Sequence, residues 1–578
     1  MTASKTRRFR RPGRSSGATN LGIAVAVLAI LVPLLLQVAT AAPPTAAEFA
    51  PNAQHVIKQA PPGQGVAEAP GQPSPPPSPS ASPTPSKSPP GTLQVPPDQV
   101  KNCVGPPPLR QIEDPQSPPC IAYWKGDNGG VTSQGVTRDS IYIAIPTPEG
   151  KTNNYEALRK FFNKRFQFYG RQLVFEYCSS SGGGSGSADQ TSQDSDAAMA
   201  AAGCSPNMPK PFASQFYRQN NGRYYMEAMG CRYHVIAVGS YSPYDSTYMN
   251  QCAPYLYQYP MVVDQEFATI GDWTCARLVG RNATHAAGRD SATPPGNLKD
   301  HKRKFGIMLA PFTADDPVAT TKALKPITSR LHACGVDIPS KDIIINPVTG
   351  LFDPSSAQNA VLQMKQDNVT TILCECNFFS FGSLQRAADS SDYYPEWATS
   401  TFGLNDVNSS FILGQGPDDQ MAHTFGLTFQ PQMVGPLLNP YNIALQEGDP
   451  SVGPDTTTLV EAELEIYRGL LLLASGIQMA GPKLTPTTFR DGLRRTHFPN
   501  PITKTHAGFV GFPSNGYSMT DDAAEWWFST TDNGPFSDSS SNPGTVCYVE
   551  KGIRRTIGDF PHGGADPFFT GPCYSGAT

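Results

Sequence analysis

The sequence predicts an α/β protein with two doubly wound lobes, preceded by a membrane segment and a disordered proline-rich linker. Three observations lead to this prediction. An apolar run at residues 21–38 follows a basic head, residues 61–99 are dominated by proline and serine, and after residue 136 short apolar strands alternate with amphipathic helices. Such alternation is typical of parallel sheets that are covered by helices on both faces. Two series of similar length predict two lobes.

The N-terminal region predicts export from the cytoplasm. Its basic cluster consists of Lys5, Arg7, Arg8, Arg10, Arg11 and Arg14. No further Lys or Arg occurs before Lys58, and positive charge is retained on the cytoplasmic side, so the rest of the chain is expected outside. We assign residues 1–20 to a basic cytoplasmic head and residues 21–42 to a transmembrane anchor or a signal peptide. The run approaches the length of a bilayer span, and Ala39-Thr40-Ala41 matches a cleavage pattern, so both alternatives stay open.

The composition limits the partners of the remaining chain. Residues 43–118 form the linker, which cannot bury a core and is expected to extend as polyproline II. Residues 119–578 form the folded domain. With 16% charged residues and a formal net charge of -4, the chain offers no basic face, and a nucleic-acid partner is not expected. Its 12 cysteines are even in number and all follow the apolar run, which predicts disulfides in an exported chain.

Lobe one is assigned to about residues 136–285 and part of the C-terminal region. Ile141, Ile143 and Ile145 alternate along a strand at 140–145, and the apolar residues of 155–169 recur on one helical face. Further strands are expected at 173–177, 211–215 and 233–240, and further helices at 197–202, 218–229 and 269–280.

Lobe two is assigned to about residues 300–450 and the rest of the C-terminal region. Strands are expected at 304–312, 342–348 and 369–376 and around Trp397 and Phe425, and helices at 317–331, 356–366 and 381–388. Pro326 is expected to kink the first of these helices. An apolar helix at 458–479 carries Glu461, Glu463 and Glu465 in its first turns, which favours a buried crossover helix over a membrane span. The tail is expected to be β-rich.

The cysteines suggest specific pairings. Cys178 and Cys204 bracket a glycine-rich stretch that lacks the Gly-Lys-Ser/Thr ending of a phosphate loop, so a disulfide-closed surface loop is expected there. Cys547 and Cys573 are a second expected pair. Cys374 and Cys376 are expected in two separate disulfides. No hydrolase, zinc-protease, EF-hand or zinc-finger motif occurs, so we expect neither an enzyme nor a bound metal or cofactor.

A family resemblance adds to this interpretation. GVTRDSIYIAI and the following residues to 177, then PFASQ (211–215) and VIAVGSYSPYD (235–245), resemble the extracellular solute-binding proteins of branched-chain amino-acid ABC transporters. The order of elements supports the resemblance to about residue 480. It implies the type I periplasmic-binding-protein fold, with three hinge crossovers, and a small organic solute held between the lobes. It also implies either delivery to an ABC-transporter permease or a role as a solute sensor.

The resemblance selects loops at the carboxyl ends of the strands, where such folds bind ligands. The implied ligand-binding residues are Ser214, Gln215, Tyr241 and Ser242 in lobe one and Phe312, Thr313, Asp315, Asn377, Phe378 and Phe402 in lobe two. Many aromatic residues and few charges in lobe two favour an apolar solute. A place in the core remains an alternative for Phe378, Phe379 and Phe402. The alternative function is an envelope interaction module whose cleft is altered or plugged.

Overall fold

The fold is known from a computed structural model. It describes residues 102–105, 109–147, 152–180, 187–215, 222–239, 244–291, 296–299, 301–312, 318–348, 354–406, 416–455, 466–495, 516–534 and 544–576. The chain divides into two units, Met1–Pro85 and Ser86–Thr578, and all the described elements belong to the second. No helix among the described residues has the length and apolarity to cross a bilayer. The predicted anchor or signal at 21–42 and most of the predicted linker lie outside the described residues and stay predictions.

Lobe one is built on a five-stranded parallel sheet. Its strands are β1 (Ser140–Thr147), β2 (Gln172–Ser179), β3 (Ala213–Gln215), β4 (Ile236–Gly239) and β5 (Leu256–Gln258). They lie in the order β2-β1-β3-β4-β5, and each neighbouring pair is parallel. Its helices are α2 (Asn153–Arg165), α3 (Ser187–Ala202), α4 (Arg223–Glu227), α5 (Ser246–Gln251), α12 (Pro440–Gly448), α14 (Arg468–Ala480) and α15 (Pro486–Arg495).

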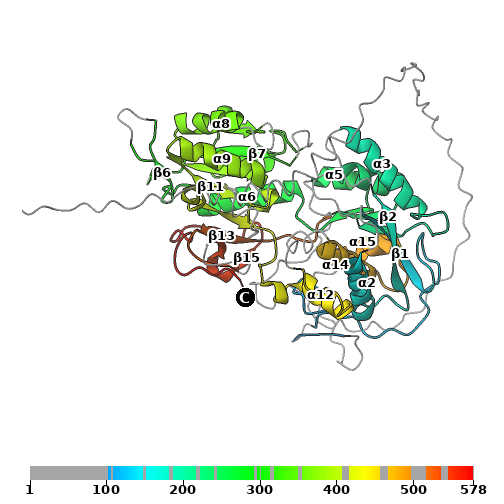
Figure 1. The fold of residues 1–578 in the computed structure, drawn as a ribbon. Helices are drawn as coiled ribbons and strands as arrows, with labels where there is room; N and C mark the ends of the chain where they lie inside the picture. Colours follow the sequence, from blue (N-terminus) through cyan, green and yellow to red (C-terminus); the bar gives the residue numbers. More distant parts are fainter. Residues whose placement is uncertain are drawn as a thin grey trace, which may run out of the picture. The chain divides into compact units, whose positions relative to one another are not determined.

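Alternation along the strands explains why both faces of this sheet are covered. Ile141, Ile143 and Ile145 of β1 point into a core shared with α2, α12, α14 and α15, whereas Ala144 points into a core shared with α3, α4 and α5. Successive side chains of a strand alternate between faces, so a strand that is apolar on both sides needs helices on both sides. Figure 1 shows α2 and α14 on one side of this sheet and α3 and α5 on the other.

Lobe two is built on a larger, mixed sheet. Its strands are β7 (Phe305–Ala310), β8 (Ile343–Ile345), β9 (Thr371–Cys376), β11 (Glu396–Thr399), β12 (Thr424–Thr428), β13 (Ala523–Ser529), β14 (Thr545–Tyr548) and β15 (Arg554–Arg555). The order is β14-β13-β12-β11-β9-β7-β8, with β15 beside β13. The pairs from β8 to β12 are parallel, and those made by β13 are antiparallel. Its helices are α6 (Val263–Arg277), α7 (Lys325–Ala333), α8 (Pro354–Gln366), α9 (Phe378–Ser390) and α11 (Asp418–Met421), and β6 (Ala287–Gly288) pairs with β10 (Tyr393–Tyr394).

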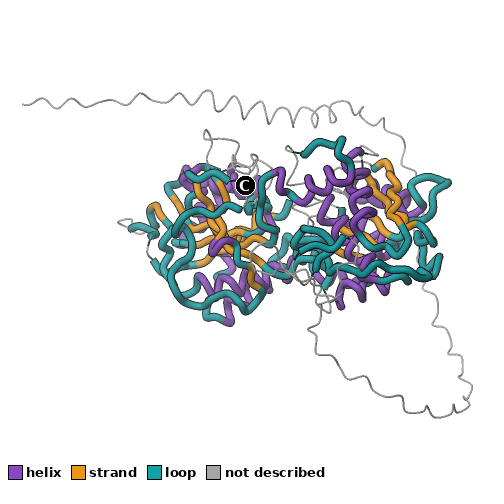
Figure 2. The backbone as a smooth tube through the Cα atoms, turned by 90° about the horizontal axis from the view of Figure 1, so that it is seen from below, coloured by secondary structure: helices purple, strands orange, loops and turns teal. Residues whose placement is uncertain are grey.

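The parallel strands of the two sheets follow the same order. Counted along the chain within each lobe, both read 2-1-3-4-5, which is the doubly wound order that places a ligand beside the first strand, where the order reverses. Figure 2 shows two groups of strands, each flanked by helices. The predicted α/β architecture with two doubly wound sheets is confirmed, and the antiparallel β13–β15 confirm the predicted β-rich tail.

Three crossovers connect the lobes. The first, residues 259–262, leaves the end of β5, and the second, residues 429–439, leaves the end of β12. The third enters β13 through residues 516–522, where Ser518 pairs in parallel with Gln258 and the Thr520 hydroxyl donates to the Tyr259 carbonyl at 3.2 Å. Crossovers one and three therefore run side by side. Because the first two leave from carboxyl ends of strands, the carboxyl ends of both sheets border the crossovers.

Several elements differ in placement from the sequence prediction. The sequence placed the helix at 269–280 in lobe one, but α6 packs against α7 in the core of lobe two because the chain crosses over before α6. Pro326 does not kink a helix but stands in the first turn of α7, where its missing N–H costs nothing. The helix predicted at 458–479 is described from residue 466, and α14 is buried as expected.

Candidate functional site

Three half-buried phenylalanines meet where the strand order of sheet two reverses. Phe312 follows the end of β7, and Phe378 and Phe379 open α9 after β9. The rings of Phe312 and Phe378 lie edge to face with centroids 5.5 Å apart, and those of Phe378 and Phe379 lie 4.3 Å apart. Such pairs are favourable arrangements of aromatic rings. The structure thus brings together two of the predicted site residues, Phe312 and Phe378, and adds Phe379 to form an aromatic cluster.

Asn377 positions this cluster. Its side-chain amide donates to the carbonyls of Ala310 and Pro311 at 3.0 and 2.8 Å, and its Oδ1 accepts from the Ser380 N–H at 3.0 Å. One side chain therefore caps α9 and ties the end of β9 to the end of β7. With these polar atoms engaged inside the protein, Asn377 holds Phe312 and Phe378 next to each other rather than presenting its amide to a ligand.

Other predicted residues are placed in the interior. Phe402 is 3% exposed and packs on Phe267, so its place is the core of lobe two. The Ser214 hydroxyl is fully buried and lies 2.7 Å from the Tyr225 hydroxyl. Gln215 is fully buried too, and its side chain lies against the first turn of α14. The predicted site residues Tyr241, Ser242, Thr313 and Asp315 lie outside the described residues.

A buried pair of carboxyl groups lies close to the first crossover and was not predicted from the sequence. The Ser400 hydroxyl lies 2.9 Å from Glu266 Oε1 and 2.5 Å from Glu375 Oε2, and all three side chains are buried. A hydroxyl donates only one hydrogen bond, so one carboxyl carries a proton and donates to Ser400. Burial raises the pKa of Glu375 to about 8, and burial together with the Glu375 charge raises that of Glu266 well above its usual value.

Arg554 joins the second and third crossovers. Its guanidinium donates to Asp522 Oδ1 at 2.8 Å and to the Asp522 carbonyl at 3.0 Å, and also to the carbonyls of Gln430 and Phe429 at 2.6 and 3.2 Å. The side chains of Arg554 and Asp522 are 2% and 0% exposed. This buried network connects both crossovers to β15. It was not predicted from the sequence either, since Arg554 lies 32 residues from Asp522 and more than a hundred residues from Gln430.

The described residues contain six disulfides. Cys178 is bonded to Cys204 and Cys547 to Cys573, as predicted. The other pairs are Cys103–Cys120, Cys231–Cys252, Cys275–Cys334 and Cys374–Cys376.

The expectation of two separate disulfides for Cys374 and Cys376 is wrong. Residues two apart on a strand point to the same face, and the two Cα atoms are 5.2 Å apart, within reach of one disulfide. Glu375 between them points to the opposite face, toward Ser400. Among the described residues, the grouping Asp532, Cys547 and Cys573 has the spacing of a metal site, but its cysteines are oxidised to a disulfide and offer no thiolate.

The chain is similar to solved structures of ABC-transporter substrate-binding proteins. No protein-family model and no curated protein matches the sequence. Similar solved structures include a fatty acid ABC transporter substrate-binding protein from Thermomonospora curvata, with 14% identity, a TM-score of 0.45, and coverage of 75% of this chain and 98% of that one. An ABC-transporter substrate-binding protein from Aeropyrum pernix has 8% identity, a TM-score of 0.45, and coverage of 67% and 92%.

A third similar structure is a solute-binding protein from Rhodopseudomonas palustris BisB5 in complex with 3,4-dihydroxybenzoic acid, with 11% identity, a TM-score of 0.44, and coverage of 74% and 99%. The repeated strand order and the three crossovers give the two-lobed arrangement that the resemblance to type I periplasmic-binding proteins implied.

Proposed function

We propose that this chain is an extracytoplasmic solute-binding protein without catalytic activity that captures a small organic solute for an ABC-type importer or as a sensor. The observation that carries the proposal is the aromatic cluster of Phe312, Phe378 and Phe379 beside the first strand of sheet two. Half-buried rings at a topological switch point offer apolar contact area where doubly wound sheets bind ligands. No charged side chain takes part in the described cluster, which favours an apolar solute.

The crossovers support a closing motion. In the part of the chain that the structure describes, three segments link the lobes, and the carboxyl ends of both sheets border them. A solute that contacts both lobes stabilises the closed form by its extra contacts there, which is the basis of hinge closure. Small-angle scattering with and without solute measures this motion, and an unchanged radius of gyration at saturation would contradict it.

The location outside the cytoplasm is part of the proposal. Six disulfides among the described residues fit an oxidising compartment. The basic head and residues 21–42 would hold the protein at the membrane, with the proline-rich linker as a spacer, or would be removed after export. Sequencing the N-terminus of the mature protein distinguishes the two, because a retained anchor keeps the basic head and a cleaved signal exposes a new terminus near residue 42.

The solute is best identified directly. The full chain is purified under native conditions, small molecules released on denaturation are identified by mass spectrometry, and the identified solute is titrated back by calorimetry. We expect Phe378→Ser to weaken binding by about tenfold or more, equivalent to about 1.4 kcal/mol of lost contact. Leu362→Ser, at a partly exposed position of α8, is the matched control and should bind normally. Equal affinity of Phe378→Ser and Leu362→Ser would place the site elsewhere.

One observation favours the second candidate, an envelope interaction module with an altered cleft. The resemblance implies that Ser214 and Gln215 hold the solute in lobe one. Both residues are 0% exposed, and the Ser214 hydroxyl is hydrogen-bonded to the Tyr225 hydroxyl. If no small molecule is released from the purified chain and none binds in calorimetry, this second candidate replaces the solute receptor. A protein partner captured by the wild type and lost in Phe378→Ser would then support it.

A further inference from the structure

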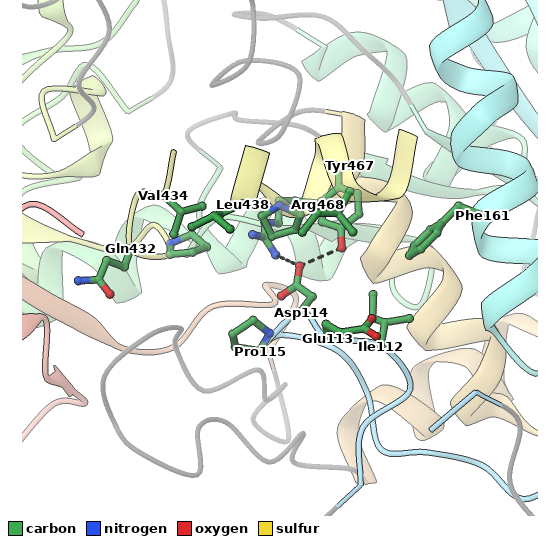
Figure 3. Close-up of a pocket in the computed structure, with 13 residues that line it drawn as sticks. Ile112, Glu113, Asp114, Pro115, Phe161, Gln432, Val434, Leu438, Tyr467 and Arg468 are labelled. Carbon is green, nitrogen blue, oxygen red and sulfur yellow. Dashed lines mark hydrogen bonds and ion pairs between the residues drawn. The ribbon is translucent and has the colours of Figure 1, made fainter. Parts of the chain in front are cut away.

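A pocket of about 210 Å³ lies away from the aromatic cluster, beside the second crossover. One wall is α2, another is the start of α12, and the base is the first turn of α14 (Figure 3). The remaining wall is the turn at residues 112–115 of an N-terminal hairpin, whose arms are closed by the Cys103–Cys120 disulfide and paired between Arg110 and Pro119. The pocket is thus built from segments that are distant in sequence, and crossover two contributes Pro431, Gln432 and Val434.

The base of this hairpin pocket is polar and its charges are compensated. Asp114 Oδ2 accepts from Arg468 Nη1 at 2.7 Å and from the Tyr467 hydroxyl at 2.9 Å, as Figure 3 shows. The side chains of Arg468 and Asp114 are 2% and 1% exposed. Glu113 at the rim is paired with Arg165 at 2.7 Å. Because each of these carboxylates already faces an arginine, the pocket carries little net charge, and an ion entering it would lose hydration without gaining a partner.

The walls are apolar. Phe161, Val434, Leu438 and Ile443 supply hydrocarbon surface, and Leu438 and Ile443 are 47% and 41% exposed. Gln432 lies at the edge of the pocket, and its buried amide points away from the other lining side chains (Figure 3). The pocket therefore presents mainly hydrocarbon to an occupant, and burial of that surface favours an apolar molecule.

We propose that the hairpin pocket is a second ligand site, for an uncharged and mainly apolar molecule. A cavity of about 150 Å³ holds benzene, so this pocket has room for a ring of that size with a short side chain. The hydrocarbon part contacts Phe161, Val434 and Leu438. An occupant touches both the body of lobe one and crossover two, and so stabilises the position of that crossover relative to the hairpin.

The test uses 2-phenylethanol as the probe and the full chain labelled with ¹³C at Ile, Leu and Val methyl groups. We expect saturable shifts of the Val434, Leu438 and Ile443 signals, with an affinity in the millimolar range or tighter. Phenylacetate, which has a carboxylate in place of the alcohol, should bind more weakly because the pocket offers it no free cation. Shifts that never saturate, or that avoid these three residues, would overturn the proposal.

Two neighbouring leucines give a matched pair of variants. Leu438 lines the pocket, whereas Leu437 is 73% exposed and does not. We expect Leu438→Arg to abolish the saturable shifts and Leu437→Arg to leave them unchanged, with equal melting temperatures because neither position is in the core. Equal loss in both variants would refute the assignment. Phe378→Ser should leave probe binding intact, which separates this site from the proposed solute site.

Discussion

Removal of the Arg554 side-chain charge should destabilise lobe two strongly. Arg554→Met keeps the aliphatic stem but deletes all four hydrogen bonds that hold Asp522, Gln430 and Phe429. Both members of the Arg554–Asp522 ion pair are at most 2% exposed. Loss of one partner from a buried ion pair costs about 3–5 kcal/mol, mainly because the remaining charge stays buried without its counterion. We therefore expect a loss of this size in the free energy of unfolding.

The assay is equilibrium unfolding in urea followed by tryptophan fluorescence. Of the 5 tryptophans in the chain, Trp273, Trp397, Trp526 and Trp527 lie in elements of lobe two, so the emission reports on this lobe. The double variant Arg554→Met/Asp522→Asn should be more stable than Arg554→Met alone, because it removes the uncompensated charge.

The control for this experiment is an exposed ion pair. Arg138 lies 3.6 Å from Asp127, with side chains that are 72% and 74% exposed, and Arg138→Met should leave the unfolding midpoint unchanged. A cost for Arg554→Met below about 1 kcal/mol, the usual range of a solvated pair, would refute the reasoning. So would strictly additive effects of the two substitutions in the double variant, since they would mean that the two side chains do not interact.

Three further predictions concern stability. Since the pKa of Glu375 is raised to about 8 by burial, the folded state holds a proton that the unfolded state releases. The free energy of unfolding should then fall as pH rises from about 5 to 8, by up to about 1.4 kcal/mol per pH unit for one proton, and Glu375→Gln should flatten this slope. Replacing Cys178 and Cys204 by serine removes a disulfide between residues that are 26 apart in the sequence. This should lower the free energy of unfolding by about 3 kcal/mol. Gly426→Ala should prevent normal folding of lobe two, because its Cβ would lie 1.8 Å from the Thr399 carbonyl oxygen.

Each of these predictions has a decisive readout. For Glu375→Gln, urea midpoints are measured across the pH range, and a slope equal to that of the wild type would contradict the raised pKa of Glu375. For the cysteine pair, the melting temperature is compared with that of the reduced wild type, and a double variant as stable as the oxidised protein would contradict the estimate. For Gly426→Ala, the soluble yield and near-UV circular dichroism are compared with those of Gly453→Ala, a glycine with open space around it.

Local patterns in the sequence were sufficient to predict the α/β architecture. The alternation of Ile141, Ile143 and Ile145 predicted β1, and the three-and-four spacing after Tyr155 predicted α2, because a strand or a helix with a buried face imposes its own period on nearby residues. Repetition of such units predicted two doubly wound sheets. The pairs Cys178–Cys204 and Cys547–Cys573 were predictable for the same reason, since each closes a short loop within one lobe.

The side of a strand or loop on which a residue lies was harder to predict. Phe312, Phe378 and Phe402 all follow strands of sheet two, yet Phe402 is 3% exposed in the core and the other two form the half-buried cluster. Ser214 was expected in a loop after a strand, but it lies in the middle of β3, and its hydroxyl points into lobe one toward Tyr225. Cys374 and Cys376 lie two residues apart on β9, so their side chains point to the same face. This spacing was the signal in the sequence that could have predicted their disulfide.

By itself, the sequence determined the α/β class, the order of elements, two of the cysteine pairs, and the loops at which a ligand site was expected. Only the tertiary structure decided where the chain crosses between lobes, which carboxyl groups meet at Ser400, and which cysteines meet on β9. It also decided that the hairpin at residues 109–120 closes a pocket against crossover two. The physical reason is the separation in sequence. Strand and helix periodicity arises from neighbours a few residues apart, whereas Glu266 and Asp114 obtain partners more than a hundred residues away, as Arg554 does in Gln430.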